Sequence, residues 1–175
     1  MKGSKLAFLV LLCSVLLMVS FQSDVSAYKR EKWKLGGPTM SYKWGASLKN
    51  GTIKTGWQNA ISSWESNTKG GANIDLFYNK SSVHYLTRFT RADTGHYGQM
   101  NTKYNKNGIV TKFEGFLNDK AVKNSNVAKS TAVHELGHAF GIAHVSGTSI
   151  MNTRRDRNKM TNPQNDDIRG VNSIY

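Results

Sequence analysis

Apolar side chains recur at helical spacing in the first half of the chain. They are three or four residues apart, as on one face of an α-helix, and they are Ile53, Trp57, Ala60, Ile61 and Trp64. Thr52 is the expected N-cap of this helix, and Gly70-Gly71 ends it. At this spacing the two tryptophans are expected to be core residues, and a binding surface is the alternative.

Two further helices are expected in the second half of the chain. One covers residues 127–140 and begins at Ser125 or Asn126, either of which can cap it. The other begins at Asn162-Pro163, because proline is well tolerated at the first helical position. The side chains expected to face inward from this last helix are Ile168, Val171, Ile174 and Tyr175.

Five shorter segments alternate between apolar and polar residues and are predicted to be strands. They cover residues 39–44, 73–78, 83–90, 98–104 and 109–118. Asn107-Gly108 predicts a hairpin between the last two strands. Residues 28–34 are basic and polar and are interpreted as an arm that precedes a Gly-Gly-Pro turn.

The first 27 residues have the pattern of a secretory signal peptide. Lys2 and Lys5 precede an apolar run from Leu6 to Val19, and Val25-Ser26-Ala27 is a small-residue cleavage site. The apolar run is short for a membrane span, which needs about 20 residues, and an uncleaved anchor is the alternative. We therefore expect a secreted, extracellular protein without a stable membrane anchor, folded over residues 28–175 as one domain.

Cleavage after Ala27 would leave a basic domain without cysteine, because Cys13 lies in the apolar run. No disulfide could then stabilise the domain. Loss of Lys2, Lys5 and Asp24 lowers the formal net charge from +13 to +12. This charge would attract anionic cell-surface polymers, although an ordinary solvated surface explains it equally well. No nucleic-acid-binding motif is present, and we expect a monomer.

The most informative stretch runs from His134 to His144 and fits the pattern H-E-x-x-H-x-x-G-x-x-H. His134 and His138 are four residues apart, so a helix places both on one face, where they can share a metal ion. Gly141 can adopt the left-handed conformation that ends a helix and would bring His144 back as a third ligand. Three neutral imidazoles leave the fourth tetrahedral position of Zn²⁺ open, as in catalytic zinc sites.

A chance match to this pattern is a poor alternative. Five fixed positions, each with a frequency of about one in 20, give roughly one match in three million windows. A buried amphipathic helix would have no reason to carry these residues in register.

The motif, followed by Ser149-Ile150-Met151, resembles the zinc site and Met-turn of metzincin metalloproteases. Residues 162–171 are similar to the terminal helix of the matrixins, and residues 39–175 are most like a small bacterial-type matrixin catalytic domain. The resemblance implies an α+β, zincin-like fold. It comprises a twisted five-stranded mixed sheet with an antiparallel edge strand, a zinc-binding active-site helix, a Met-turn and a C-terminal helix.

The resemblance also implies roles for individual residues. His134, His138 and His144 would bind one catalytic zinc ion. Glu135 would accept a proton from the zinc-activated water as general base and deliver one to the leaving amine. Met151 would lie beneath the metal, and an ordinary core methionine is the alternative.

The substrate cleft is expected along the edge strand, where an extended peptide would pair with the backbone. Gly95 and Gly98 would let the substrate backbone approach, unless they belong to a plain loop. The candidate cleft residues are Gly98, Gln99, Met100 and Asn101.

Three arginines follow the Met-turn, at positions 154, 155 and 157. Either they line the pocket beyond the turn and favour acidic side chains of the substrate, or they belong to a solvated loop.

Two histidines, His84 and His96, lie outside the motif. A second, structural zinc is not expected, because Asp93 and His96 lack the spacing of the matrixin site. His84 and His96 are interpreted as lone core or surface histidines. Acidic residues are too few for a calcium cage.

Together these features predict a secreted zinc-dependent endopeptidase with protein or peptide substrates. A secreted basic metzincin-like binding protein with little turnover is one alternative, and a structural zinc protein is another. Glu135 favours the enzyme, because a binding protein needs no proton acceptor beside its metal.

Overall fold

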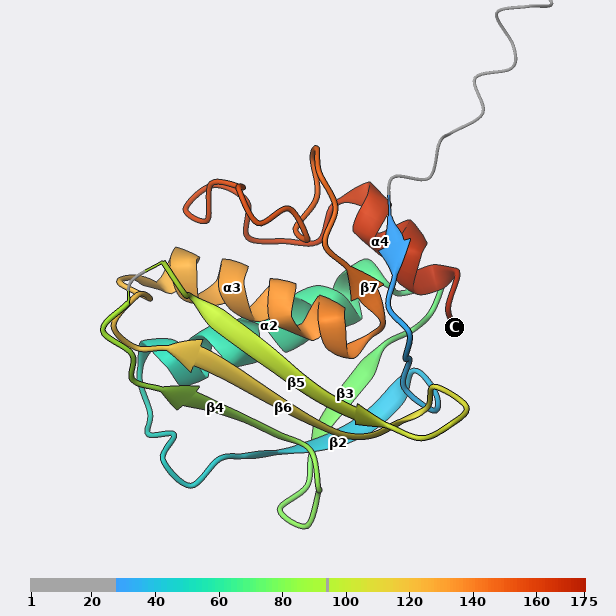
Figure 1. Cartoon of the computed structure of the whole chain (residues 1–175), viewed down its shortest axis with the longest axis horizontal. Helices are drawn as coiled ribbons and strands as arrows, with labels where there is room; N and C mark the ends of the chain where they lie inside the picture. Colours follow the sequence, from blue (N-terminus) through green and yellow to red (C-terminus); the bar gives the residue numbers. More distant parts are fainter. Residues whose placement is uncertain (1–27, 94) are drawn as a thin grey trace, which may run out of the picture.

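The structure, a computed structural model, describes residues 28–93 and 95–175. The predicted signal peptide, residues 1–27, lies outside the described residues and stays a prediction. In the described part, two helices cover one face of a sheet and a third lies near the chain ends (Figure 1). No helix in these ranges is long and apolar enough to cross a membrane.

Five strands form one mixed sheet in the order β3-β2-β4-β6-β5. The first four pair in parallel, and β5 pairs antiparallel with β6 at the sheet edge. The predicted sheet is confirmed, although three strands begin one or two residues later than the alternation predicted. The strands are β2 (Thr39–Trp44), β3 (Asp75–Tyr78), β4 (Tyr85–Phe89), β5 (Gly98–Tyr104) and β6 (Val110–Asn118).

The predicted hairpin connects β5 and β6. The Asn105 amide donates to the Ile109 carbonyl at 2.9 Å, and the Gly108 amide donates to the Asn105 carbonyl at 2.9 Å. Gly108 has a φ of 72°, which explains why the turn needs glycine there.

Helices α2 (Thr52–Asn67) and α3 (Ser125–Ala139) pack against each other on the same face of the sheet (Figure 1). Their backbones approach closely where Gly56 meets Ala128. A Cβ atom added to Gly56 would lie 2.7 Å from the Ala128 Cβ.

The core contains both tryptophans of α2. Trp57 and Trp64 are fully buried, and their indole nitrogens donate to the carbonyls of Thr87 and Val133, each at 2.9 Å. The prediction that they are core residues is confirmed. The paired indole N–H groups explain how such large amphipathic rings can be buried here.

The helix caps differ from the prediction. Gly51, not Thr52, is the N-cap of α2, and no side chain caps that helix. Asn124 caps α3 in place of Ser125 or Asn126, with its side chain accepting a hydrogen bond from the Val127 amide at 3.0 Å. Several neighbouring residues can cap a helix, so composition alone did not choose among them.

The terminal helix α4 (Asn165–Asn172) begins later than predicted, and Pro163 lies before its N-cap. Its N-cap is Gln164, which forms a capping box with Asp167. Of the predicted inward-facing residues, Val171 is buried, while Ile174 and Tyr175 pack against the core. Ile168 was wrongly predicted to face inward and instead lines a surface pocket.

Residues 28–34 do not form a free arm. β1 (Lys29–Arg30) pairs antiparallel with β7 (Ile142–Ala143), a short strand that follows α3. Lys34 then bonds to the hairpin, donating to the Gly108 carbonyl at 2.9 Å. The segment therefore connects the end of α3 with the hairpin between β5 and β6. The sequence of residues 28–34 gave no sign of these contacts, because β7 and the hairpin are both distant in sequence.

Candidate metal centre and active site

The structure brings the three motif histidines together. The Nε2 atoms of His134 and His138 each lie 3.0 Å from Nε2 of His144. Tetrahedral Zn²⁺ with Zn–N bonds of 2.0–2.1 Å places its nitrogen ligands about 3.3 Å apart. The donor set and the spacing therefore fit one zinc ion. Within the described ranges, these residues form the one group of three potential ligands gathered within 4.8 Å.

Gly141 makes this arrangement possible. It has a φ of 96°, as expected for the residue that turns the chain away from α3. A Cβ atom here would also lie 2.6 Å from the Trp33 carbonyl oxygen. Both the backbone conformation and the close approach therefore require glycine.

Backbone carbonyls hold two of the rings. His134 Nδ1 lies 2.8 Å from the Ile150 carbonyl, and His138 Nδ1 lies 3.1 Å from the Ile142 carbonyl. A carbonyl only accepts, so each Nδ1 carries the proton and each Nε2 is free for the metal. Arg155 Nη1 is 3.2 Å from His134 Nδ1. Since both would be donors, we assign its hydrogen bond to the Asn152 carbonyl at 3.1 Å.

The surroundings favour neutral imidazoles, the form that binds metal. Burial lowers the pKa of His134 well below its ordinary value, and the positive charge of Arg155 lowers it further. Burial also lowers the pKa of His144.

Glu135 is buried beside the histidines, with 6% of its surface exposed. Burial raises the pKa of its carboxyl to about 7. A carboxyl group with this pKa can exchange a proton near neutral pH.

Gly98 of the edge strand approaches Glu135 directly. A Cβ atom on Gly98 would lie 2.7 Å from Glu135 Oε1 and 2.7 Å from Thr131 Cγ2. The missing side chain of Gly98 thus makes room for α3, and its role toward the substrate backbone stays a prediction. Gly95 lies in the adjoining loop and lines the same cleft.

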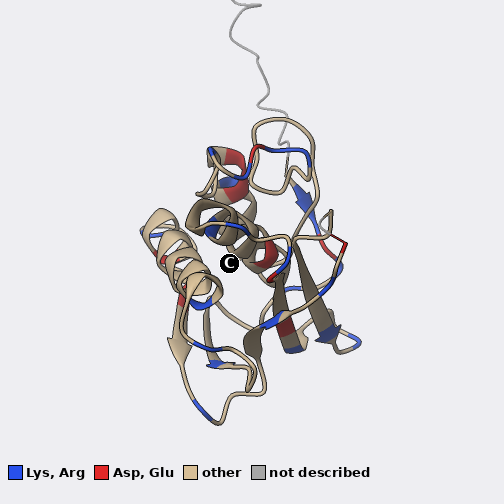
Figure 2. Ribbon diagram, turned by 90° about the vertical axis from the view of Figure 1, so that its left-hand side faces the viewer, with Lys and Arg blue, Asp and Glu red and all other residues tan. Residues whose placement is uncertain are grey.

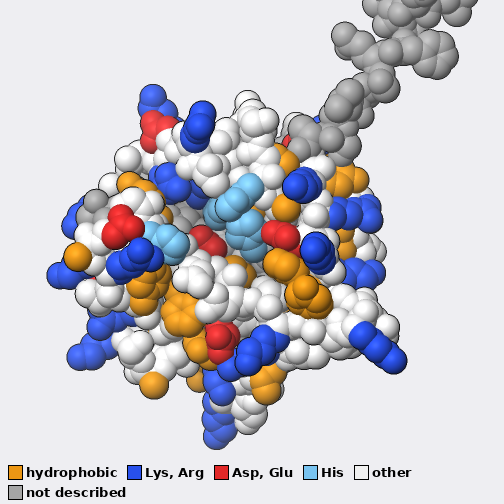
Figure 3. Space-filling view, viewed as in Figure 1, with side chains coloured by type: hydrophobic (Ala, Val, Ile, Leu, Met, Phe, Trp, Pro, Cys, Tyr) orange, Lys and Arg blue, Asp and Glu red, His pale blue; other side chains and the backbone are white. Residues whose placement is uncertain are grey.

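A cleft of about 380 Å³ opens over these residues. Histidines gather in the middle of this face, in a hollow with acidic side chains close by (Figure 3). Of the predicted cleft residues, Gly98, Gln99 and Met100 line it, whereas Asn101 is not among the lining residues. Asn101 lies farther along β5 and accepts a hydrogen bond from the Gln99 side chain at 2.5 Å.

Met151 is buried, with 1% of its surface exposed. A Cβ atom on Gly137, a variable position of the motif, would lie 2.5 Å from the Met151 sulfur, so the absence of a side chain there makes room for this methionine. Asp167, a residue of α4, holds the turn that contains Ser149, Ile150 and Met151. Its carboxylate accepts hydrogen bonds from the Ser149 hydroxyl at 2.5 Å and the Ile150 amide at 2.8 Å.

The three arginines after the Met-turn have different environments. Arg155 is buried and donates to the Ser130 hydroxyl and carbonyl, and burial lowers its pKa to about 10. Arg157 lies 4.1 Å over the Tyr97 ring. Arg155 and Arg157 line the cleft and Arg154 does not, and the expected preference for acidic side chains stays a prediction.

The two remaining histidines occupy different places. His84 is buried, stacks on Phe113 with ring centroids 4.5 Å apart, and accepts a hydrogen bond from the Phe113 amide at 3.0 Å. It is a core histidine. His96 lines the cleft. Asp93 instead bonds to the Gly95 amide within its own loop.

Sequence reasoning missed Glu31, Asp167 and the structural role of Arg155. Glu31 Oε1 lies 3.2 Å from His138 Nδ1. No spacing rule connects a carboxylate in the N-terminal segment with a metal ligand in α3. Asp167 lies in the segment that resembles the matrixin tail, so that resemblance was a signal for it.

Comparisons with known proteins agree with this geometry. A sequence profile described as matrixin matches residues 20–175. Among curated proteins, no sequence matches. Among solved structures, the fold is similar to that of high choriolytic enzyme 1, a hatching enzyme zinc-protease from Oryzias latipes (medaka fish). The identity is 14% and the TM-score 0.53, with 81% of this chain and 92% of that chain covered.

The structural likeness, at this identity, concerns the fold alone. The profile match covers nearly the whole chain, including the zinc motif, the Met-turn and the terminal helix. It confirms the resemblance inferred from the sequence and implies zinc as the cofactor. The chain belongs to the matrixin family and is a zinc metalloendopeptidase.

Proposed function

We propose that the protein is a secreted endopeptidase in which His134, His138 and His144 hold the catalytic zinc and Glu135 transfers the proton. The observation that carries this proposal is the arrangement of three Nε2 atoms next to a buried carboxyl group, in a cleft bordered by a free sheet edge. Met151 forms the apolar floor of the site.

The zinc, when bound, supplies Lewis acidity that lowers the pKa of a water molecule and polarises the scissile carbonyl. Glu135 accepts a proton from this water in its ionised form. Its pKa of about 7 leaves it able to release that proton to the leaving amine. The Ile150 and Ile142 carbonyls hold the His134 and His138 rings at Nδ1, which leaves their Nε2 atoms available to a metal.

The edge strand β5 orients the substrate. An extended peptide would pair antiparallel with β5, since its outer backbone groups have no strand partner in the sheet order. Gly98 at the start of β5 lies against Glu135, and Tyr104 at its end lies against Trp33. The residues after the scissile bond would therefore lie toward Gly98, and those before it toward Trp33.

The side chain after the scissile bond would enter the part of the cleft lined by Arg155 and Arg157. Arg155 already donates to three acceptors, so Arg157 is the group left to attract an acidic side chain. We therefore include a preference for Asp or Glu at this position in the proposal.

Hydrolysis of quenched peptides by the zinc-loaded enzyme tests the proposal. Glu135→Gln should retain zinc and lose about 10²- to 10⁴-fold in kcat, the usual contribution of a proton-transfer group. Glu65→Gln, a matched change on α2, should leave kcat unchanged. Peptides with Asp, Glu or Leu after the bond test the preference.

Full turnover by Glu135→Gln would disprove the assignment of Glu135. Equal cleavage of all three peptides would remove the acidic preference alone. Zinc binding without hydrolysis of any peptide would favour the alternative, a basic binding protein. Figure 2 shows Lys and Arg spread over several elements rather than gathered on one. Secretion is testable by detecting residues 28–175 in culture medium.

A further inference from the structure

We infer that Glu31 is a positioning residue for the metal centre. This inference rests on the proposed zinc ligation by His138. It adds a carboxylate from the N-terminal segment to the surroundings of that ligand. Glu31 Oε1 lies 3.2 Å from His138 Nδ1, the ring nitrogen that points away from the proposed metal position. Both side chains are largely shielded, with 20% of Glu31 and 14% of His138 exposed.

Backbone pairing holds Glu31 in this place. Its amide donates to the Gly141 carbonyl at 2.8 Å, next to the β1–β7 pairs. Gly141 is the residue that turns the chain from His138 toward His144. The carboxylate is therefore attached to the same turn that carries the third ligand.

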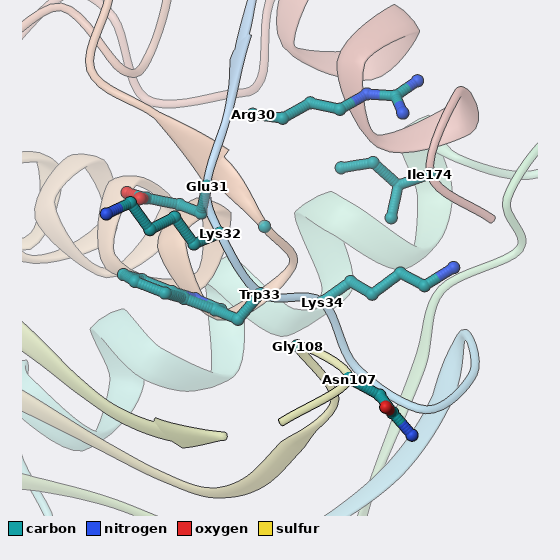
Figure 4. A pocket seen from close by; sticks show the side chains of 9 residues that line it. Arg30, Glu31, Lys32, Trp33, Lys34, Asn107, Gly108 and Ile174 are labelled. Atoms are coloured by element: carbon teal, nitrogen blue, oxygen red, sulfur yellow. The ribbon is translucent and has the colours of Figure 1, made fainter. Parts of the chain in front are cut away.

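Trp33 attaches residues 28–34 a second time to α3, the helix that carries His134 and His138. Its indole nitrogen donates to the His138 carbonyl at 3.0 Å, and its ring stacks on Tyr104 at 5.4 Å. Figure 4 shows Glu31 and Trp33 leaving the segment on one side, while Arg30 and Lys34 leave it on the other toward Ile174. Lys32 lies on the same side as Glu31 in this view, while Arg30 and Lys34 point away from α3.

The charges around the site show what Glu31 contributes. A dication would bind three neutral imidazoles next to the buried cation Arg155. The carboxylate of Glu135 is committed to proton transfer in the proposed function. Glu31 provides a second negative charge, beside the Nδ1–H that becomes more acidic when Nε2 binds a metal. The Ile142 carbonyl accepts the Nδ1–H at 3.1 Å, and the Glu31 carboxylate adds its negative charge 3.2 Å from the same nitrogen. A carboxylate beside the outer nitrogen of a histidine ligand raises the basicity of that ligand.

The test compares zinc affinities of full domains by competition with a chromogenic chelator. The variants are Glu31→Ala, which removes the carboxylate, and Glu31→Gln, which keeps its shape without the charge. The control is Asp75→Asn, which makes the same charge change at an exposed position on β3. Loss of such an outer carboxylate typically weakens metal binding 10- to 100-fold. We expect that loss for Glu31→Ala, a smaller one for Glu31→Gln and none for Asp75→Asn.

The absorption spectrum of the cobalt-substituted proteins gives a second readout, because it reports ligand geometry independently of hydrolysis. A changed spectrum in the Glu31 variants, with the control unchanged, would support the inference. Zinc affinity within twofold of wild type in both variants would overturn it, as would lower activity at unchanged affinity. If Glu31→Ala does not fold, the affinity of Glu31→Gln decides. Failure of the Glu135 assignment would appear in hydrolysis and leave these affinities unaffected.

Discussion

Single residues near the metal differ in how their environment sets their charge. Burial raises the pKa of the Glu135 carboxyl to about 7, and burial lowers the pKa of His134. Both shifts favour the neutral side chain in the absence of metal. A bound zinc ion favours the ionised form of Glu135 and leaves the imidazole of His134 neutral. These are the protonation states that the proposed hydrolysis requires.

His84 shows the same principle away from the metal. Burial lowers its pKa, and its Nδ1 accepts the Phe113 amide only when that nitrogen is unprotonated. A lowered pKa means that the unfolded chain binds the proton more tightly. The contribution of His84 to stability is therefore complete above its unfolded pKa of 6.5 and decreases as the pH falls below it.

Urea unfolding between pH 7.5 and 5 measures this effect. The wild type should lose stability more steeply over this range than His84→Asn, whose side-chain oxygen can accept the bond but cannot titrate. The metal ligands also titrate, but equally in both proteins, so the difference isolates His84. Parallel curves for the two proteins would contradict the prediction.

At the scale of elements, the packing of α2 against α3 positions the site. Gly56 lets the two helices approach, and a Cβ atom there would lie 3.0 Å from the Ala128 backbone carbon as well as 2.7 Å from its Cβ. Helix propensity favours alanine over glycine by about 1 kcal/mol. Overpacking against a backbone costs about 1–3 kcal/mol, and this term should dominate.

We therefore expect Gly56→Ala to lower the free energy of unfolding by about 1–2 kcal/mol, the overpacking cost less the gain in helix propensity. Gly37→Ala is the matched control, because a Cβ atom on Gly37 would have no neighbour within 4 Å and no positive φ is involved. It should change stability by less than about 0.5 kcal/mol. Thermal unfolding compares the stability of the two variants with that of the wild type. A stabilised Gly56→Ala would show that α2 and α3 can move apart without loss of stability.

The sequence predicted elements better than it predicted their contacts. Trp57 and Trp64 repeat with the period of a helix, and strand alternation is equally local, so both were recognisable. The motif histidines were recognisable because three ligands of one metal lie within eleven residues. Glu31 could not be predicted, since its contact depends on the pairing of β1 with β7. The helix starts at Gln164 and Asn124 were missed because tertiary contacts selected among several local caps.

At the scale of the whole molecule, Tyr175 connects three distant segments. Its hydroxyl accepts a hydrogen bond from the Leu35 amide at 2.9 Å and donates to the Phe140 carbonyl at 3.0 Å. Burial raises its pKa to about 12, so it stays protonated and can donate. The last residue of the chain thus fastens the N-terminal segment to the end of the metal helix.

Tyr175→Phe should lower the free energy of unfolding by about 1–3 kcal/mol, because it leaves two backbone groups without a partner. Tyr78→Phe removes a hydroxyl from a side chain that is 56% exposed and should have little effect. Urea unfolding of the zinc-loaded proteins compares them. Equal stability of the two variants would mean that water replaces the lost bonds.

The first described residues lie against the terminal helix α4, near the end of the chain. Arg30 donates to the Ser173 carbonyl at 2.8 Å, and the Tyr28 side chain is 3.0 Å from the position of a Cβ on Gly170. A short flexible linker could therefore join residue 175 to residue 28 without disturbing either element. New ends could be opened in the exposed turn at residues 79–81, on the side of the sheet opposite β5 in the strand order. Such a circular permutant would place the metal-binding turn and its N-terminal carboxylate in one continuous stretch of chain, protected from fraying at both sides.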